Sequence, residues 1–111
     1  FGGLSAEKDI LQMDINLSYG IEEFLRMIKA AEEFGWSRRD FIPHAGHQLA
    51  LHVSAGLGLG GHEVAFTTDS PFEGVSDDTR IEGGTAYLSD SPGVGIENKP
   101  TLYRYFDGLI D

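Results

Sequence analysis

The first two thirds of the sequence alternate between short apolar stretches and segments with helical periodicity. Residues 9–17, DILQMDINL, predict a buried strand that ends near Asp14. Residues 20–35 place apolar side chains on one helical face and charged ones on the other, with Gly35 where a left-handed cap belongs. FIPH (41–44) predicts a second strand, residues 47–58 a second helix, and HEVAF (62–66) a third strand. This order, with its short connections, predicts an α/β fold of parallel strands joined by right-handed crossovers.

The pattern changes after Thr67. The following residues are rich in Gly, Ser, Asp and Pro and have no helical periodicity, and TRIEGGTAYLSD predicts a hairpin that turns at Gly83–Gly84. Residues 101–110 predict a short terminal helix. We therefore divide the chain into residues 1–66 and residues 67–111. Three parallel strands leave two open edges and an uncovered face, so we expect part of a larger fold, and the start at Phe1 also suggests a fragment.

Composition narrows the classes of function. Eighteen acidic residues against eight basic ones give a net charge of −10, which disfavours nucleic acid as a partner. No apolar run approaches the roughly 20 residues of a membrane span. The absence of cysteine excludes disulfides and thiolate metal sites and favours a reducing compartment, so we expect a cytoplasmic protein. The open strand edges favour self-association as a homo-oligomer.

Three of the four histidines lie within residues 44–52. His44 and His47, with His62 and Glu63, would in principle supply four ligands for zinc. The sequence lacks both the helical H-E-x-x-H arrangement and a cysteine pair, so we predict no metal site. His52 fits a packing residue within the second helix, and His47 fits a residue of that helix's first turn.

His44 follows the second predicted strand, at the edge where ligands meet the sheet in parallel α/β proteins. Asp14 has the same place on the preceding strand, and Glu63 lies on the next one. A carboxylate beside an imidazole fixes its tautomer and raises its basicity, so we predict that Asp14 and His44 lie within hydrogen-bond reach. Each residue also has a plain structural reading: Asp14 as a loop acid, His44 as a turn residue and Glu63 as a surface residue.

Three blocks of sequence carry a family resemblance. LQMDINLSYG, WSRRDFIPHAGHQLALHVSAGLGLGGHE and SPGVGIENKPTLY resemble, in this order and spacing, the C-terminal third of the mandelate racemase/muconate lactonizing enzyme group of the enolase superfamily. The likeness is nearest to the acid-sugar dehydratases of the D-tartrate dehydratase type. The resemblance implies the last three strands and helices of a (β/α) TIM-type barrel, followed by a C-terminal segment that returns to an α+β capping domain.

The resemblance also implies roles for three residues. His44 matches the family's catalytic histidine, Asp14 the aspartate that hydrogen-bonds it, and Glu63 a glutamate near the substrate carboxylate. His47, His52 and His62 match no catalytic group. The family's lysine motif and its acidic magnesium ligands match nothing in this chain.

The implied reaction is loss of water from a hydroxy acid, through α-proton abstraction and β-elimination, catalysed by a hydro-lyase. The intact enzyme would use magnesium. We expect that this chain by itself binds no magnesium and is inactive. The small-molecule substrate would be a hydroxy-acid carboxylate of the tartrate kind. We assign proton donation to His44. Two alternatives stay open: a racemase or epimerase of the same superfamily, and a non-catalytic fragment that self-associates.

Overall fold

The structure, a computed structural model, describes residues 2–65 and 73–110. Its helices are α1 (Ile21–Glu33), α2 (Gln48–Leu57) and α3 (Pro100–Asp107), and its strands are β1 (Arg80–Glu82) and β2 (Thr85–Tyr87). Two 3-10 turns, η1 (Arg38–Asp40) and η2 (Ile96–Asn98), complete the elements. No helix within these two ranges is both long and apolar enough to cross a membrane.

The first two predicted strands lie side by side in parallel, but neither forms a regular strand. One parallel bridge joins Leu11 and Phe41. Around it, Leu11 N–H donates to the Asp40 carbonyl at 2.8 Å, and the N–H groups of Ile42 and His44 donate to the carbonyls of Leu11 and Met13 at 3.1 Å each. The predicted direction and neighbourhood of these two segments are therefore correct, whereas their regularity is not.

The third predicted strand, residues 62–66, is also wrong as a regular strand. Residues 62–65 have no assigned secondary structure, and Phe66 lies outside the described residues. Among the described residues, the last backbone hydrogen bond between the second and third segments is the one that Gly60 N–H donates to the Phe41 carbonyl at 3.0 Å. A parallel ladder would continue from the N–H of residue 43 to the carbonyl of residue 60, and Pro43 has no N–H to donate.

In the first region, residues 2–65, both helices form where the periodicity predicts them. Gly35, in a left-handed conformation with φ 90°, follows the end of α1 as expected. Gly58 caps α2 in the same left-handed region. One detail of the prediction is wrong: His47 is not in the first turn of α2 but is its N-cap, with extended backbone angles.

The core is built from side chains of both helices, of the paired segments and of the connection after α1. It is one cluster of buried apolar side chains: Leu11, Ile15, Phe24, Ile28, Ala31, Trp36, Phe41 and Ala50. Leu11 and Ile15 come from the first segment, Phe41 from the second and Ala50 from α2. Both helices therefore cover the same face of the paired segments and leave the other face for polar side chains.

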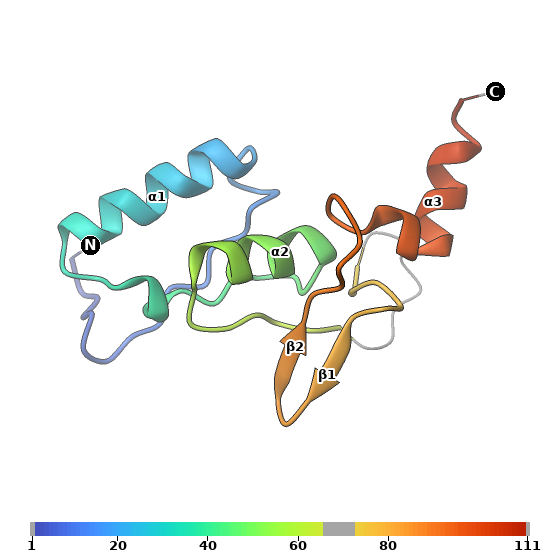
Figure 1. Ribbon diagram of the computed structural model, residues 1–111. Coiled ribbons are helices and arrows are strands. Elements are labelled where there is room, and N and C mark those ends of the chain that lie inside the picture. The colour runs from blue at the N-terminus through green and yellow to red at the C-terminus, as the bar shows by residue number, and fades with distance from the viewer. Residues whose placement is uncertain (1, 66–72, 111) are drawn as a thin grey trace.

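The second region, residues 73–110, extends away from this core. The hairpin β1–β2 pairs Glu82 with Thr85 across Gly83–Gly84, as predicted, and both glycines have the positive φ of a tight hairpin turn. Helix α3 forms near its predicted place and projects at the end of the molecule opposite α1 (Figure 1). The predicted boundary between residues 66 and 67 lies outside the described residues, so the division of the chain stays a prediction.

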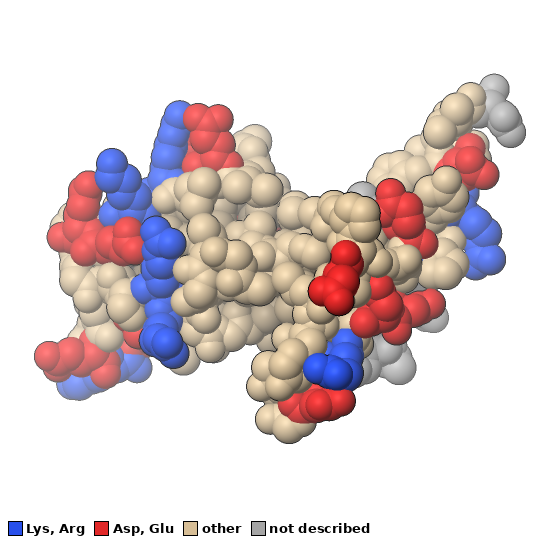
Figure 2. All heavy atoms as spheres, viewed as in Figure 1, with Lys and Arg blue, Asp and Glu red and all other residues tan. Residues whose placement is uncertain are grey.

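Charged side chains gather at the two ends of the molecule. Figure 2 shows them over α1 and again over the hairpin and α3, while the middle of this face is free of them. Helix α2, which occupies that middle, has no Asp, Glu, Lys or Arg in its sequence. The acidic excess of the chain is therefore concentrated away from its centre on this face.

Candidate functional site

Polar side chains meet on the face of the paired segments that the helices leave uncovered. Gln12 and Asp14 alternate with the core residue Leu11 along the first segment, and His44 follows Phe41 on the second. Residues two apart in extended chain share a face. Glu63, from the third segment, joins this group through hydrogen bonds with Gln12 and with the backbone of Ala45.

The hydrogen bond that the sequence predicts between Asp14 and His44 is present. His44 Nδ1 lies 3.0 Å from Asp14 Oδ2. The other carboxylate oxygen of Asp14 accepts the backbone N–H groups of Asn16 at 2.7 Å and Leu17 at 3.0 Å. The Asp14 side chain is 11% exposed and that of His44 is 55% exposed. A fixed, nearly buried carboxylate thus holds one end of an accessible imidazole.

This contact moves the pKa of both groups. Burial pushes the pKa of Asp14 upward, but the hydrogen bonds from His44, Leu17 and Asn16 outweigh it and leave the pKa below its ordinary value. The hydrogen bond that His44 donates to Asp14 raises the pKa of His44 above its ordinary value; burial opposes this effect, and the charges of Glu63 and Asp14 add to it. Both shifts favour a charged pair.

The geometry fixes which nitrogen of His44 is free to react. A carboxylate oxygen can only accept, so Nδ1 carries a proton and donates it to Asp14. Nε2 is then a lone-pair base when the ring is neutral and an N–H acid when it is charged. His44 can therefore take or give a proton at Nε2 while Asp14 holds the ring in place.

Glu63 connects all three segments. Its Oε2 accepts the backbone N–H of Ala45 at 2.8 Å, and its Oε1 accepts Gln12 Nε2 at 2.6 Å. The prediction that Glu63 contacts a substrate carboxylate stays a prediction. Within the protein, Glu63 holds the backbone that directly follows His44.

The loop after His44 is strained and tightly packed. Ala45 has φ 82°, a left-handed conformation that costs a non-glycine residue about 1–2 kcal/mol. Gly46 is also left-handed, and a Cβ at this position would lie 2.9 Å from the Glu63 carbonyl oxygen. The hydrogen bond from Ala45 to Glu63 helps to hold this conformation, which sets the direction of the loop that follows His44.

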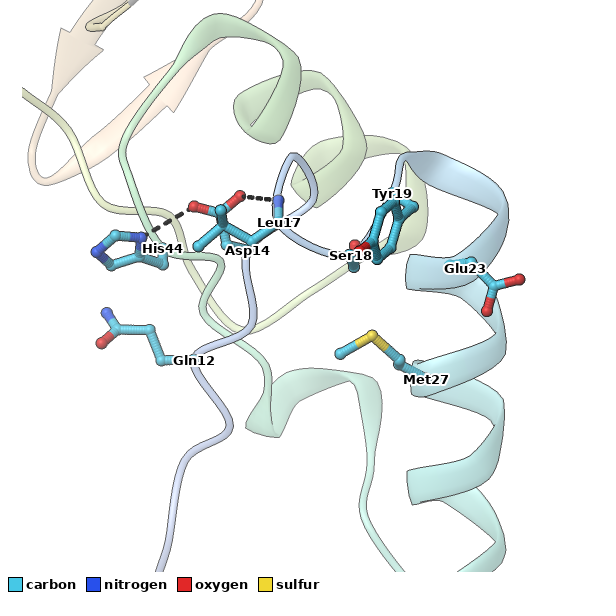
Figure 3. A pocket seen from close by; sticks show the side chains of 8 residues that line it. All are labelled: Gln12, Asp14, Leu17, Ser18, Tyr19, Glu23, Met27 and His44. Carbon is cyan, nitrogen blue, oxygen red and sulfur yellow. Dashed lines mark hydrogen bonds and ion pairs between the residues drawn. The ribbon is translucent and has the colours of Figure 1, made fainter.

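An open pocket of about 590 Å³ lies beside the Asp14–His44 pair. Figure 3 shows His44 and Gln12 on one side of it, and Tyr19 and Met27 on the side nearer α1. The accessible imidazole therefore borders a pocket whose walls are partly polar and partly apolar. Such a mixture suits a small polar molecule with a defined orientation.

The remaining histidines do not line this pocket. His52 is half-buried, and its Nε2 lies 3.1 Å from the side-chain nitrogen of Gln48. His47 is buried at the start of α2, and His62 Nε2 donates to the His47 carbonyl at 3.2 Å.

Gln12 and Asn16 also belong to the hydrogen-bond network around the site and were not predicted. The two-residue spacing of Gln12 from Asp14 is the signal that would have indicated it.

The acidic side chains of the site are occupied by hydrogen bonds within the protein. Within residues 2–65 and 73–110, no group of three or more His, Asp or Glu side chains is arranged to hold a metal ion. All four carboxylate oxygens of Asp14 and Glu63 already accept hydrogen bonds from the protein. The described residues therefore do not fit the magnesium site that the resemblance implies for an intact enzyme.

A family comparison agrees with the resemblance at a coarse level. Residues 5–102 match the family model described as "Enolase C-terminal domain-like". The match includes the two paired segments, the third segment that carries Glu63, and most of the second region. It supports membership of the enolase superfamily, whereas the dehydratase subgroup stays a prediction. Because the match covers nearly the whole chain, this protein belongs to the enolase C-terminal domain-like family.

Proposed function

We propose that this chain supplies the histidine–aspartate pair of a hydroxy-acid dehydratase, a hydro-lyase that acts on a tartrate-like acid-sugar carboxylate. The observation that carries the proposal is the hydrogen bond from His44 to Asp14, which leaves Nε2 of an accessible imidazole beside a pocket. Members of the superfamily are usually enzymes, which favours a catalytic use of this pair.

His44 acts as the general acid in this proposal. A base outside this chain removes the proton next to the substrate carboxylate. The bond between the β-carbon and its hydroxyl then breaks, and the departing oxygen takes the proton from His44 Nε2 and leaves as water. Hydroxide is a poor leaving group, so a positioned proton donor contributes typically about 10²–10⁴-fold. Asp14 favours the charged ring, so His44 keeps its donor proton to a higher pH than an unperturbed histidine does.

Magnesium belongs to the proposal only for the intact enzyme. The described residues of this chain do not fit a magnesium site, since their carboxylates are occupied by protein hydrogen bonds. Any metal ligands would come from outside these residues. The role of His44 is therefore derived without a metal-dependent step.

A racemase or epimerase is the second candidate. The same observation favours it, because Nε2 of a neutral His44 would remove and return the α-proton on one face of the substrate. The two candidates differ in whether His44 meets the α-proton or the leaving hydroxyl.

Replacement of His44 by Asn in the full-length enzyme separates them. If His44 is the acid, the variant loses dehydration by about 10²–10⁴-fold but still exchanges the α-proton of recovered substrate with deuterium from heavy water. Product formation is measured by chromatography and exchange by mass spectrometry. His52→Gln, in α2 and outside the pocket lining, is the matched control and retains both activities. Loss of exchange together with dehydration in a folded His44→Asn variant would reject the acid role and favour His44 as the base that meets the α-proton, the role it has in the racemase candidate.

A further inference from the structure

His47 occupies a position where its residue type is unusual. It is the N-cap of α2, is only 6% exposed, and its Nδ1 accepts the N–H of Ala50 at 3.1 Å. Ser, Thr, Asp and Asn are the side chains that usually cap helices, because a short side-chain oxygen reaches the same N–H. Capping alone therefore does not explain a histidine here. What an imidazole adds is a second nitrogen on the far side of the ring.

That second nitrogen contacts the loop that carries Asp14. His47 Nε2 lies 3.2 Å from the side-chain amide of Asn16. Since Nδ1 accepts a hydrogen bond, the proton of the neutral ring is on Nε2, which must then donate. The amide atom at this position is Nδ2, which would oppose one donor with another, so we assign the amide in the turned orientation, with its oxygen toward the ring.

Asn16 connects this contact to the candidate site. Its backbone N–H donates to Asp14 Oδ1 at 2.7 Å, while Asp14 Oδ2 accepts from His44. These hydrogen bonds form a closed circuit of contacts that runs from His44 through Asp14 and Asn16 to His47 and returns along the backbone. The returning backbone contains the left-handed residue Ala45, so the circuit encloses a strained loop.

We propose that His47 is a positioning residue: through the side chain of Asn16 it holds the loop that carries Asp14, and so it keeps Asp14 aligned on His44. This inference rests on the proposed function only for its effect on turnover, since the alignment itself is a property of the free protein. Nothing in the family resemblance gave His47 this role.

The protonation state of His47 agrees with this role. Burial lowers its pKa, and the nearby charge of His44 lowers it further against an opposing effect of Asp14. A neutral ring is required, because a proton on Nδ1 would oppose the N–H of Ala50 and remove the cap. The His47 carbonyl is held in turn by His62. His47 is thus fixed on three sides, as a positioning residue must be.

The test uses two variants of the full-length protein and a control. His47→Asn keeps an N-cap side chain but is too short to reach Asn16, and Asn16→Ala removes the other partner from an exposed position. The control, His52→Gln, changes a histidine of the same helix that takes no part in this circuit of contacts. The ring titration of His44 is followed by NMR in each protein without substrate, and kcat and KM are measured separately.

Both variants are expected to lower the pKa of His44 toward its ordinary value, because Asp14 no longer faces the ring correctly. Asp14 and Glu63 are the charges that raise the pKa of His44, and neither is altered. His47, whose charged form opposes that of His44, is replaced only in His47→Asn, so Asn16→Ala leaves every charge near His44 in place. We expect kcat to fall about 10-fold to 100-fold with KM nearly unchanged, since small misplacements of a reacting group have effects of this size. The double variant should lose no more than either single one, and His52→Gln should match the wild type.

An unchanged His44 titration in folded Asn16→Ala would overturn the proposal, as would an unchanged titration in folded His47→Asn. Failure of the proposed function has a different signature. If the protein does not dehydrate hydroxy acids but the two variants still lower the pKa of His44, the positioning role stands and the dehydratase assignment falls. If dehydration occurs and neither variant alters the His44 titration, the reverse holds.

Discussion

Residues 2–65 and residues 73–110 are held in place by different forces. Among the side chains that the structure describes, Leu102 is the only buried aliphatic or aromatic one in the second region, whereas the first region contains the whole apolar cluster. The two regions also differ in function, because Asp14, His44 and Glu63 all belong to the first. The candidate site is therefore built on the part of the chain with the strongest packing.

Polar contacts hold the second region instead. Ser76 N–H, which is buried, donates to the Gln48 side chain at 2.7 Å, and Lys99 Nζ donates to the Glu73 carbonyl at 2.7 Å. Asn98 Nδ2 donates to Asp78 at 2.7 Å. A hydrogen bond contributes about 0.5–1.5 kcal/mol net, less than the 1.5–3 kcal/mol of a large buried apolar side chain. The comparison indicates that the first region determines stability and the second is attached to it.

The largest effect is expected from damage to the first core. Phe24, on α1, is fully buried at 0% exposure. Phe24→Ala should lower the free energy of unfolding by about 3–5 kcal/mol, since it removes a large side chain and leaves a cavity. Urea unfolding followed by circular dichroism measures the change.

Tyr103→Ala is the matched aromatic substitution in the second region. Tyr103, on α3, is 50% exposed. This variant should change the free energy of unfolding by no more than about 0.5 kcal/mol, as is usual for surface substitutions. Equal losses in Phe24→Ala and Tyr103→Ala would refute the difference between the two regions.

A smaller and more local effect is expected where the regions meet. Gln48→Ala removes the acceptor for Ser76 N–H, and an unpaired buried donor costs about 1–3 kcal/mol. Limited proteolysis should then cleave residues 73–110 faster and leave residues 2–65 at the wild-type rate. Gln48→Glu keeps an oxygen at this position and serves as the control. Faster cleavage of both regions in Gln48→Ala would mean that they unfold as one unit.

The sequence predicts the helices better than the strands for a physical reason. The helical period of residues 20–35 is local and needs no neighbour, and α1 forms there. A strand is completed only by its hydrogen-bonding partners. The segments before and after Pro43 lack enough of them, so the predicted strands appear as short paired stretches.

The candidate site was predictable only in part: the contact of Asp14 with His44 was predicted, and the contacts around it were not. Asp14 and His44 follow successive parallel segments, and this placement alone indicated their contact. The hydrogen bond from Ala45 N–H to Glu63 was not predictable, because it depends on the left-handed backbone of Ala45, which its residue type does not favour. The cap at His47 was missed because histidine is not a usual N-cap residue.

The most direct test of the account is the NMR titration of the His44 ring in the wild type and in Asp14→Asn. A raised pKa means that His44 keeps its proton to a higher pH than an ordinary histidine, and that its acid form is lost as the pH rises through that pKa. The account predicts a wild-type midpoint above the ordinary value of 6.5, and a lower midpoint in Asp14→Asn, because a neutral amide no longer stabilises the charged ring. Equal midpoints in the two proteins, or a wild-type midpoint at or below 6.5, would contradict the pairing of Asp14 with His44.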